Sequence, residues 1–150
     1  MKSKLVIIVL AVMAAAFVYL KIKPVVQPNV IIIGDTVVTV EIADTPVSRA
    51  QGLSGRDSLP ADQGMYFPLE QSARHSFWMK DMRFPLDIIW IREGKIVDIS
   101  ENVPYPAGDQ PPATVQPKEP ADAVLEVNAG FTERHGLKIG DEIRMTGGNP

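Results

Sequence analysis

The 150-residue chain contains 45% hydrophobic and 22% charged residues, a balance typical of one globular domain rather than a disordered chain. It has no cysteine, which excludes disulfides, thiolate metal sites and a cysteine nucleophile. Four lysines and no acidic residue lie in residues 1–23, so the other 127 residues carry 11 basic and 18 acidic side chains, a net charge of −7. Nucleic-acid binders need clustered basic side chains to displace phosphate counterions, so this charge argues against a nucleic-acid partner.

An apolar segment, residues 5–20, opens the chain between two pairs of lysines. As a helix it would span ~24 Å, slightly less than a ~30 Å hydrocarbon core, and the flanking lysines can snorkel to the interface. We expect residues 1–23 to be either a retained membrane anchor or a signal peptide cleaved after Ala16. The anchor is favoured because the apolar run continues to Leu20. Its short N-terminal tail favours a single-pass topology in which the domain that follows is extracytoplasmic.

The remaining sequence alternates short apolar runs with turn signals, which predicts a β domain over residues 30–146. Residues 24–29 are expected to form a tether and residues 147–150 a tail. Strands are expected at residues 30–33, 36–43, 65–67, 75–80, 86–92, 95–99, 123–129 and 142–145, and short helices at 47–53 and 132–135. Six prolines in residues 104–120 predict a long surface loop. The predicted fold is a compact antiparallel β-barrel or sandwich with one or two short helices.

The two strands at residues 75–80 and 86–92 hold both tryptophans and are expected to pair as the central hairpin. Alternation in the second strand places Asp87 on the same face as Ile89 and Ile91. A carboxylate in such apolar surroundings needs a cation or hydrogen-bond donors, because an unpaired buried charge is strongly destabilising. The candidate partners are Arg56, Arg74, Lys80 and Arg83.

Several motifs follow one another in order from about Val37 to Met145. They are Arg49-Ala50-Gln51-Gly52-Leu53-Ser54-Gly55-Arg56, Leu59, Gly64-Met65-Tyr66-Phe67, Phe77-Trp78-Met79-Lys80, Pro85-Leu86-Asp87-Ile88-Ile89-Trp90-Ile91, Leu125-Glu126-Val127, Gly130 and Gly140-Asp141. Together they resemble the prokaryotic family known as domain of unknown function 192 (DUF192). That family often has an Asn-Thr pair after Trp-Met-Lys, where this sequence has Asp81-Met82. The resemblance implies a compact β-barrel-like domain, often exported behind a signal or lipid anchor, with no established enzymatic activity or cofactor.

The charged and aromatic side chains near Asp87 suggest a binding site. Our hypothesis is a pocket for a small polar ligand lined by Arg56, Trp78, Lys80 and Asp87, with Tyr66 or Trp90 at its wall. The alternative is a purely structural ion pair between Asp87 and an arginine. The two histidines, His75 and His135, are far apart in the sequence and lack a third nitrogen or sulfur ligand, so we expect no metal or cofactor.

The function predicted from these features is a non-catalytic binding or accessory module, tethered to the membrane, with a small polar ligand or an envelope protein as its partner. One alternative is an envelope-associated hydrolase in which Asp87 is the general acid or base. A second alternative is a structural docking domain that uses the proline-rich loop, residues 104–120, as its contact surface.

Overall fold

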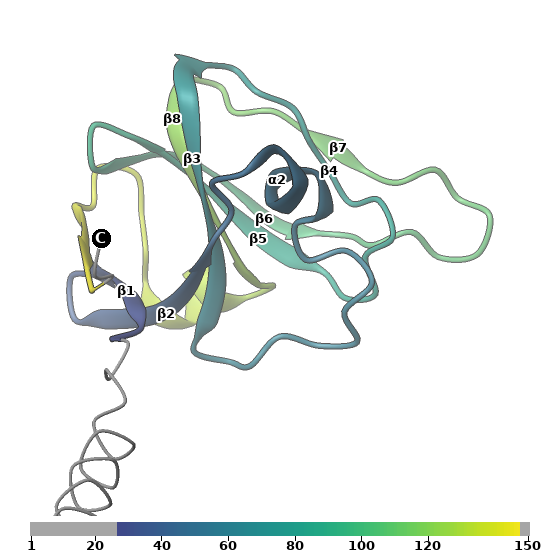
Figure 1. Ribbon diagram of the computed structural model, residues 1–150, viewed down its shortest axis with the longest axis horizontal. Helices are drawn as coiled ribbons and strands as arrows, with labels where there is room; N and C mark the ends of the chain where they lie inside the picture. Colours follow the sequence, from purple (N-terminus) through teal and green to yellow (C-terminus); the bar gives the residue numbers. More distant parts are fainter. Residues whose placement is uncertain (1–26, 148–150) are drawn as a thin grey trace, which may run out of the picture.

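The computed structural model describes residues 27–147, which form a mainly β domain with two short helices, as predicted (Figure 1). The strands are β1 (Asn29–Ile33), β2 (Thr36–Ile42), β3 (Gln63–Ala73), β4 (Phe77–Trp78), β5 (Leu86–Arg92), β6 (Lys95–Val103), β7 (Thr114–Val115), β8 (Ala121–Asn128) and β9 (Ile143–Thr146). The helices are α2 (Pro46–Gln51) and α3 (Phe131–His135). Seven strands form one sheet in the order β6-β5-β8-β3-β2-β1-β9, and β4 pairs with β7 separately.

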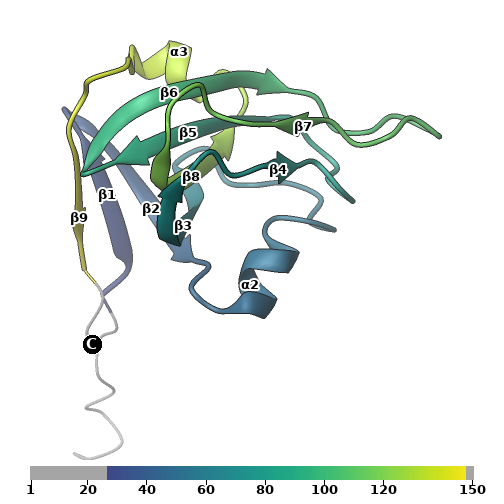
Figure 2. The same ribbon diagram turned by 90° about the horizontal axis from the view of Figure 1, so that it is seen from above.

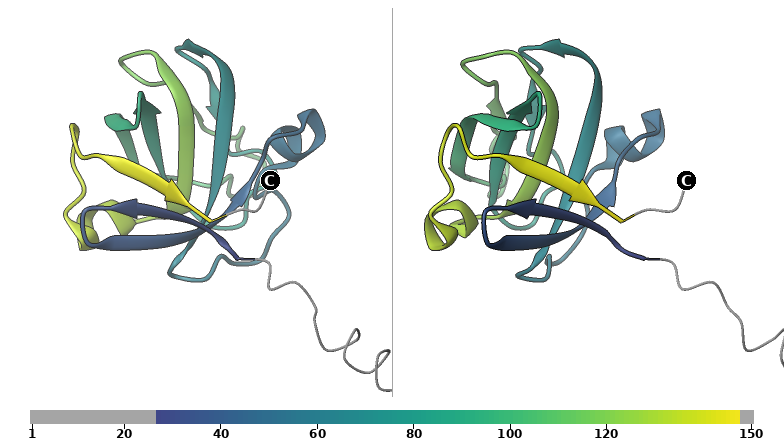
Figure 3. Two further views of the ribbon diagram at one scale, coloured as in Figure 1. Left: turned by 60° about the vertical axis from the view of Figure 1, so that its left-hand side comes forward. Right: turned by 90° about the vertical axis from the view of Figure 1, so that its left-hand side faces the viewer.

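The seven-stranded sheet curls into an open barrel whose two edge strands meet at one corner. Figure 3 shows β9 lying along β1 and the sheet curving from there to β3 and β8. At the corner, the Ile96 N–H donates to the Asp141 carbonyl (3.0 Å) and the Ile143 N–H donates to the Gly94 carbonyl (2.7 Å). These bonds satisfy backbone groups that an open sheet edge would leave unpaired.

One strand pair differs from the predicted antiparallel pattern, because β2 and β3 run parallel. A parallel pair requires a crossover connection, and α2 lies in that connection. The helix begins at Pro46, one residue before the expected start: the Thr45 side chain accepts a bond from the Ser48 N–H, and the Ser48 side chain accepts one from the Thr45 N–H. Pro46 occupies the first helical turn, where its missing N–H is harmless. The local helix signal was therefore correct, while the relative direction of the flanking strands depends on the crossover.

The predicted central hairpin is wrong. β4 pairs with β7 (Phe77 opposite Val115), whereas β5 lies between β6 and β8 in the large sheet. Only Phe77 and Trp78 of the predicted strand at 75–80 are β-paired in this way. The segment between β6 and β7 projects from the domain as a long loop, as its prolines predicted, and it returns alongside β4 (Figure 2).

Two strands are longer than predicted. β3 was expected to end at Pro68 but continues to Ala73, and its register with β8 shifts between these two residues. Such an irregularity accommodates a proline, which cannot donate to the ladder. β6 likewise continues to Val103, with register shifts in its pairing with β5.

Apolar side chains cover both faces of the central strands. We use "β4-side core" for the cluster that contains Leu86, Ile88 and Trp90, and "α3-side core" for the cluster that contains Ile89, Ile91 and Phe131. The predicted alternation of faces in β5 is thus confirmed. No helix within residues 27–147 is long and apolar enough to cross a membrane, and the expected anchor at residues 5–20 lies outside the described residues.

Candidate functional site

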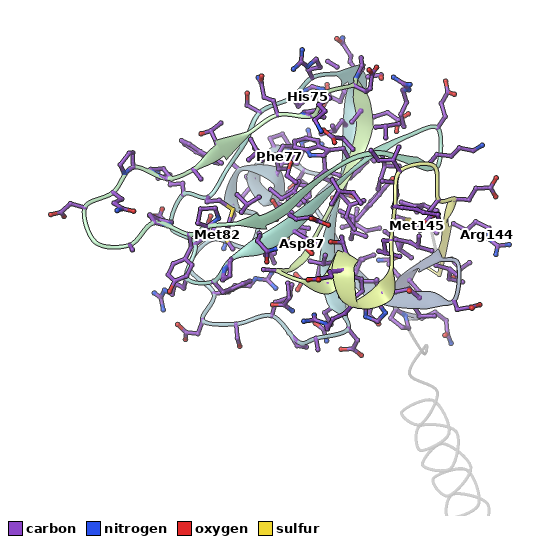
Figure 4. All side chains as sticks on the ribbon, turned by 180° about the vertical axis from the view of Figure 1, so that it is seen from behind. His75, Phe77, Met82, Asp87, Arg144 and Met145 are labelled. Atoms are coloured by element: carbon purple, nitrogen blue, oxygen red, sulfur yellow. The ribbon has the colours of Figure 1, made fainter. Side chains whose placement is uncertain are left out.

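Asp87, the centre of the predicted site, is fully buried against the N-terminus of α3 (Figure 4). One carboxylate oxygen accepts the N–H groups of Asn102 (2.8 Å) and Gly130 (3.2 Å). The other accepts the N–H (2.9 Å) and the hydroxyl (2.8 Å) of Thr132. These four donors saturate the carboxylate. Of the two kinds of partner expected, it has the hydrogen-bond donors, and no cation within residues 27–147 forms an ion pair with it. Through these bonds, Asp87 of β5 links β6 and the turn before α3 to its own strand, and it does not face solvent.

The other three predicted residues lie elsewhere and do not share a pocket with Asp87. Arg56 makes a two-pronged ion pair with Glu41 (2.5 and 2.7 Å), and this hydrogen bonding lowers the pKa of the Glu41 carboxyl. Trp78 points outward with 58% of its surface exposed. The Lys80 ammonium lies over its ring, 5.3 Å from the ring centroid.

The two predicted wall residues also lie apart from any site at Asp87. Trp90 is completely buried in the β4-side core, where its indole N–H donates to the Ser100 hydroxyl (3.0 Å). Tyr66 is half-buried and packs at the edge of the α3-side core. The hypothesis of a four-residue pocket around Asp87 therefore has no geometric basis.

A different acid, Glu126, lines a cavity in the domain. It lies on β8, which is paired on both sides, directly opposite Met65 of β3 and Ile88 of β5. The residue is only 6% exposed and its side chain points into the β4-side core, yet no residue within 27–147 forms a hydrogen bond or ion pair with its carboxyl group. Burial in these apolar surroundings raises the pKa of Glu126 to about 8, so the carboxyl is mainly protonated at neutral pH.

The Glu126 carboxyl faces a small cavity of about 40 Å³ between the sheet, the loop after α2 and the β4 segment. Buried side chains form its inner wall: Leu53, Phe67, Met79, Met82 and Leu86. More exposed residues form its mouth, namely Arg49, Gln51, Ser54 and Trp78. The result is a narrow apolar recess with one neutral acid inside and an aromatic ring and polar groups outside. We call it the Glu126 cavity.

Local hydrogen bonds hold the two segments that enclose this cavity. The Ser54 hydroxyl donates to the Lys80 carbonyl (2.8 Å), and the Gly55 N–H donates to the Asp81 carbonyl (2.9 Å). Asp81 has a φ of +56°, in the left-handed region that aspartate and asparagine tolerate better than most residues. That conformation accounts for an aspartate at a position where the DUF192 pattern often has asparagine, and it turns the chain so that Met82 reaches the core.

Arg49 is the single cation among the residues that line the Glu126 cavity. Its guanidinium donates to the Asp44 carbonyl (2.9 Å) and to Glu70 (3.1 Å), not to Glu126. The arginine is therefore held at the mouth and leaves the buried acid neutral. Residues 27–147 contain no cluster of three or more histidine or acidic side chains that could hold a metal ion.

Sequence reasoning missed Glu126 as a site residue, although its motif was one of those that carry the DUF192 resemblance. One signal was present: Glu126 is the single charged residue within the apolar run Val124-Leu125-Glu126-Val127. In a strand buried on both faces, a charged residue cannot point to solvent by alternation. Which groups surround it depends on β3, β5 and the β4 segment, so the pattern alone could not identify a cavity.

Comparison with known proteins places these features in a family. The model of the family DUF192, described as an uncharacterized ACR, matches residues 30–145. A crystal structure of a protein from Sinorhizobium meliloti 1021, provisionally named a transcription regulator, is 33% identical with a TM-score of 0.69, and the match covers 79% of this chain and 92% of that one. A protein of unknown function from Novosphingobium aromaticivorans DSM 12444 is 31% identical with a TM-score of 0.65, covering 81% and 89%. No curated protein matches. The chain belongs to the DUF192 family.

Proposed function

We propose that this protein is a non-catalytic binding module, held at the outer face of the membrane by its N-terminal segment, and that its ligand enters the Glu126 cavity. The observation that carries the proposal is the Glu126 carboxyl, which lies in apolar surroundings, forms no hydrogen bond within residues 27–147 and lines the cavity. The described residues contain no completely enclosed polar side-chain atom without a partner, so the carboxyl oxygens are open to the cavity. A polar group that is largely removed from water and has no protein partner destabilises a fold. An apolar residue would serve the strand better, so a ligand that bonds to the acid accounts for its presence.

The geometry favours binding over catalysis. Asp87 cannot act as a general acid or base because its four donors and complete burial keep it from any substrate. Glu126 is a protonated acid, but the one hydroxyl lining the cavity, that of Ser54, donates to a backbone carbonyl and has no adjacent base. The arrangement thus supplies a hydrogen-bonding group without an activated nucleophile.

Two other functions have less support. The name of the Sinorhizobium meliloti protein raises a nucleic-acid role, but the net charge of −7 outside the N-terminal segment provides no basic surface for phosphates. A docking role for the proline-rich loop rests mainly on Tyr105, which is 44% exposed. A single exposed aromatic residue is ordinary for a soluble surface.

Methionine methyl groups provide a direct test. Met79 and Met82 line the cavity, whereas Met145 lies on β9 at the other end of the molecule and serves as an internal control (Figure 4). The full chain, labelled with ¹³C at the methionine methyls and held in detergent micelles, would be titrated with acetamide, isopropanol and dimethyl sulfoxide. At least one probe should shift the Met79 and Met82 signals saturably without moving Met145.

The variant Glu126→Leu removes the hydrogen-bonding group but keeps an apolar side chain of similar size, and it should lose this response. Glu133→Gln, at an exposed position on α3, is the matched control. The proposal fails if no probe shifts the cavity methyls, or if Glu126→Leu responds as the wild type does.

A further inference from the structure

The dimensions of the Glu126 cavity limit what can enter it. A volume of about 40 Å³ is roughly three times the ~10–15 Å³ that a cavity needs to hold one water molecule, so it has room for a group of a few non-hydrogen atoms. A sugar ring, an aromatic ring or a phosphate with its hydration is too large, so only a small end group of a ligand can reach the acid. The rest of the ligand must lie at the mouth, against Trp78 and the end of α2.

The inner wall favours an uncharged group that has both an apolar part and a hydrogen-bond acceptor. The buried wall, including Leu53, Phe67 and Met79, suits a methyl group, whereas the Glu126 carboxyl can donate one O–H bond to an acceptor. A cationic end group would have to be desolvated together with an ionised carboxylate, which apolar surroundings disfavour. A methyl joined to a carbonyl, as in an acetyl group, satisfies both sides at once.

The mouth adds an aromatic platform. Trp78 is 58% exposed and lines the cavity, and the Lys80 ammonium covers one face of its ring. The other face can stack against an apolar surface, and the C–H face of a pyranose ring is such a surface. Arg49 and Gln51, at the same mouth, can hydrogen-bond to hydroxyl groups around the ring.

We propose that the ligand is an N-acetylated amino sugar whose acetamido group enters the cavity, with its carbonyl accepting from Glu126 and its pyranose ring stacked on Trp78. The inference rests on the proposed function and specifies the ligand of that same site. Ligand binding would then have two parts. The buried acid and its apolar wall bind the acetyl group, and the exposed tryptophan stacks against the sugar ring.

Four probes test both parts on the methyl-labelled full chain in micelles of a detergent that carries no sugar. N-acetylglucosamine and acetamide should both shift the Met79 and Met82 signals, whereas glucose and glucosamine should not. Trp78→Ala should raise the dissociation constant of N-acetylglucosamine by roughly three- to tenfold and leave that of acetamide unchanged. Glu126→Leu should abolish both responses, and Glu126→Gln, whose amide keeps an N–H donor, should bind more weakly than the wild type but more tightly than Glu126→Leu.

The outcomes separate the two proposals. If isopropanol or dimethyl sulfoxide binds at the cavity while the two acetylated probes do not, the acetyl inference is overturned and the binding function stands. If glucosamine binds better than N-acetylglucosamine, the site takes a cation and the inference is also overturned. If no probe shifts the cavity methyls, both proposals fail. Loss of folding in Glu126→Leu would be visible in the Met145 signal, and the effect of Trp78→Ala, at an exposed position, then carries the test.

Discussion

Asp87 and Glu126 are two buried acids on neighbouring strands, one residue apart in register, and the fold treats them in opposite ways. Asp87 faces the α3-side core and receives four hydrogen bonds from three residues. Glu126 faces the β4-side core and the cavity, and receives none from the described residues. A satisfied buried acid stabilises a fold, whereas an unsatisfied one destabilises it and is retained where it interacts with something else. On this comparison Asp87 has a structural role, and Glu126 is the residue on which the proposed function rests.

The largest expected change in the free energy of unfolding comes from disrupting the hydrogen bonds to Asp87. In Asp87→Asn, the new NH₂ group must face either the Asn102 and Gly130 N–H groups or the two donors of Thr132. The Thr132 hydroxyl can turn to accept from this NH₂ group, but a backbone N–H cannot, so at least one N–H would oppose it in either orientation. The remaining bonds would also lose their charged acceptor, so the free energy of unfolding should fall by about 3–5 kcal/mol. Chemical denaturation followed by the fluorescence of buried Trp90 measures this. A loss below about 1 kcal/mol would show that the hydrogen bonds to Asp87 are not structural.

Glu126→Gln should raise the free energy of unfolding at alkaline pH, whereas Asp87→Asn lowers it. The folded-state pKa of Glu126 is about 8, above its ordinary 4.5, so the folded protein binds the proton more tightly than the unfolded chain does. The contribution of Glu126 to stability is therefore greatest below about pH 4.5 and declines as the pH rises to about 8. Glutamine cannot ionise, so the variant should match the wild type at pH 5 and exceed it by about 2–4 kcal/mol at pH 9.

The residues around Glu126 allow the difference in pH profile to be attributed to this carboxyl. Met65 and Ile88 flank it on the neighbouring strands, and Arg49, from α2, is the other charged residue that lines the cavity. Glu133→Gln, on the exposed face of α3, should show the same pH profile as the wild type. Equal profiles for Glu126→Gln and the wild type would mean that Glu126 ionises as freely in the folded state as in the unfolded one.

Thr132→Val tests one of the four bonds to Asp87 at nearly constant side-chain shape. The variant removes the hydroxyl that donates to Asp87 at 2.8 Å but keeps the backbone N–H bond at 2.9 Å. A hydrogen bond to a charged group contributes about 1.5–3 kcal/mol, so a loss near the lower end of that range is expected. In the double variant with Asp87→Asn, the two losses should not add, because both remove the same contact.

Arg56→Ala should have the smallest effect. Its ion pair with Glu41 lies near the surface, with 35% and 53% of the two side chains exposed. Such pairs contribute about 0–1 kcal/mol and are weakened by salt. Because hydrogen bonding to Arg56 lowers the pKa of Glu41, the contribution is present above the ordinary carboxyl pKa and is lost as the pH falls below it. Binding of acetamide should not change, and a loss of binding would return Arg56 to the site.

Local patterns predicted the elements well where neighbours along the chain decide them. The β1–β2 hairpin around Gly34-Asp35 and the caps of α2 follow from bonds between residues a few positions apart. The two faces of β5 follow from alternation. The errors arose where distant segments meet. β4 and β5 are close in sequence, yet β4 pairs with β7, more than 30 residues away, because the long loop returns over the β4-side core.

The sequence alone determined a mainly β fold with two short helices, the DUF192 resemblance, and the need of Asp87 for a partner. These properties depend on composition, periodicity and motif order. The tertiary structure decided which acid was satisfied: Asp87 lies among the backbone N–H groups near α3, where no cation is needed, and Glu126 lies among apolar side chains beside a cavity. Hydrogen-bond satisfaction and enclosed volume depend on groups that arrive from distant strands, so alternation could predict that an acid is buried but not what surrounds it.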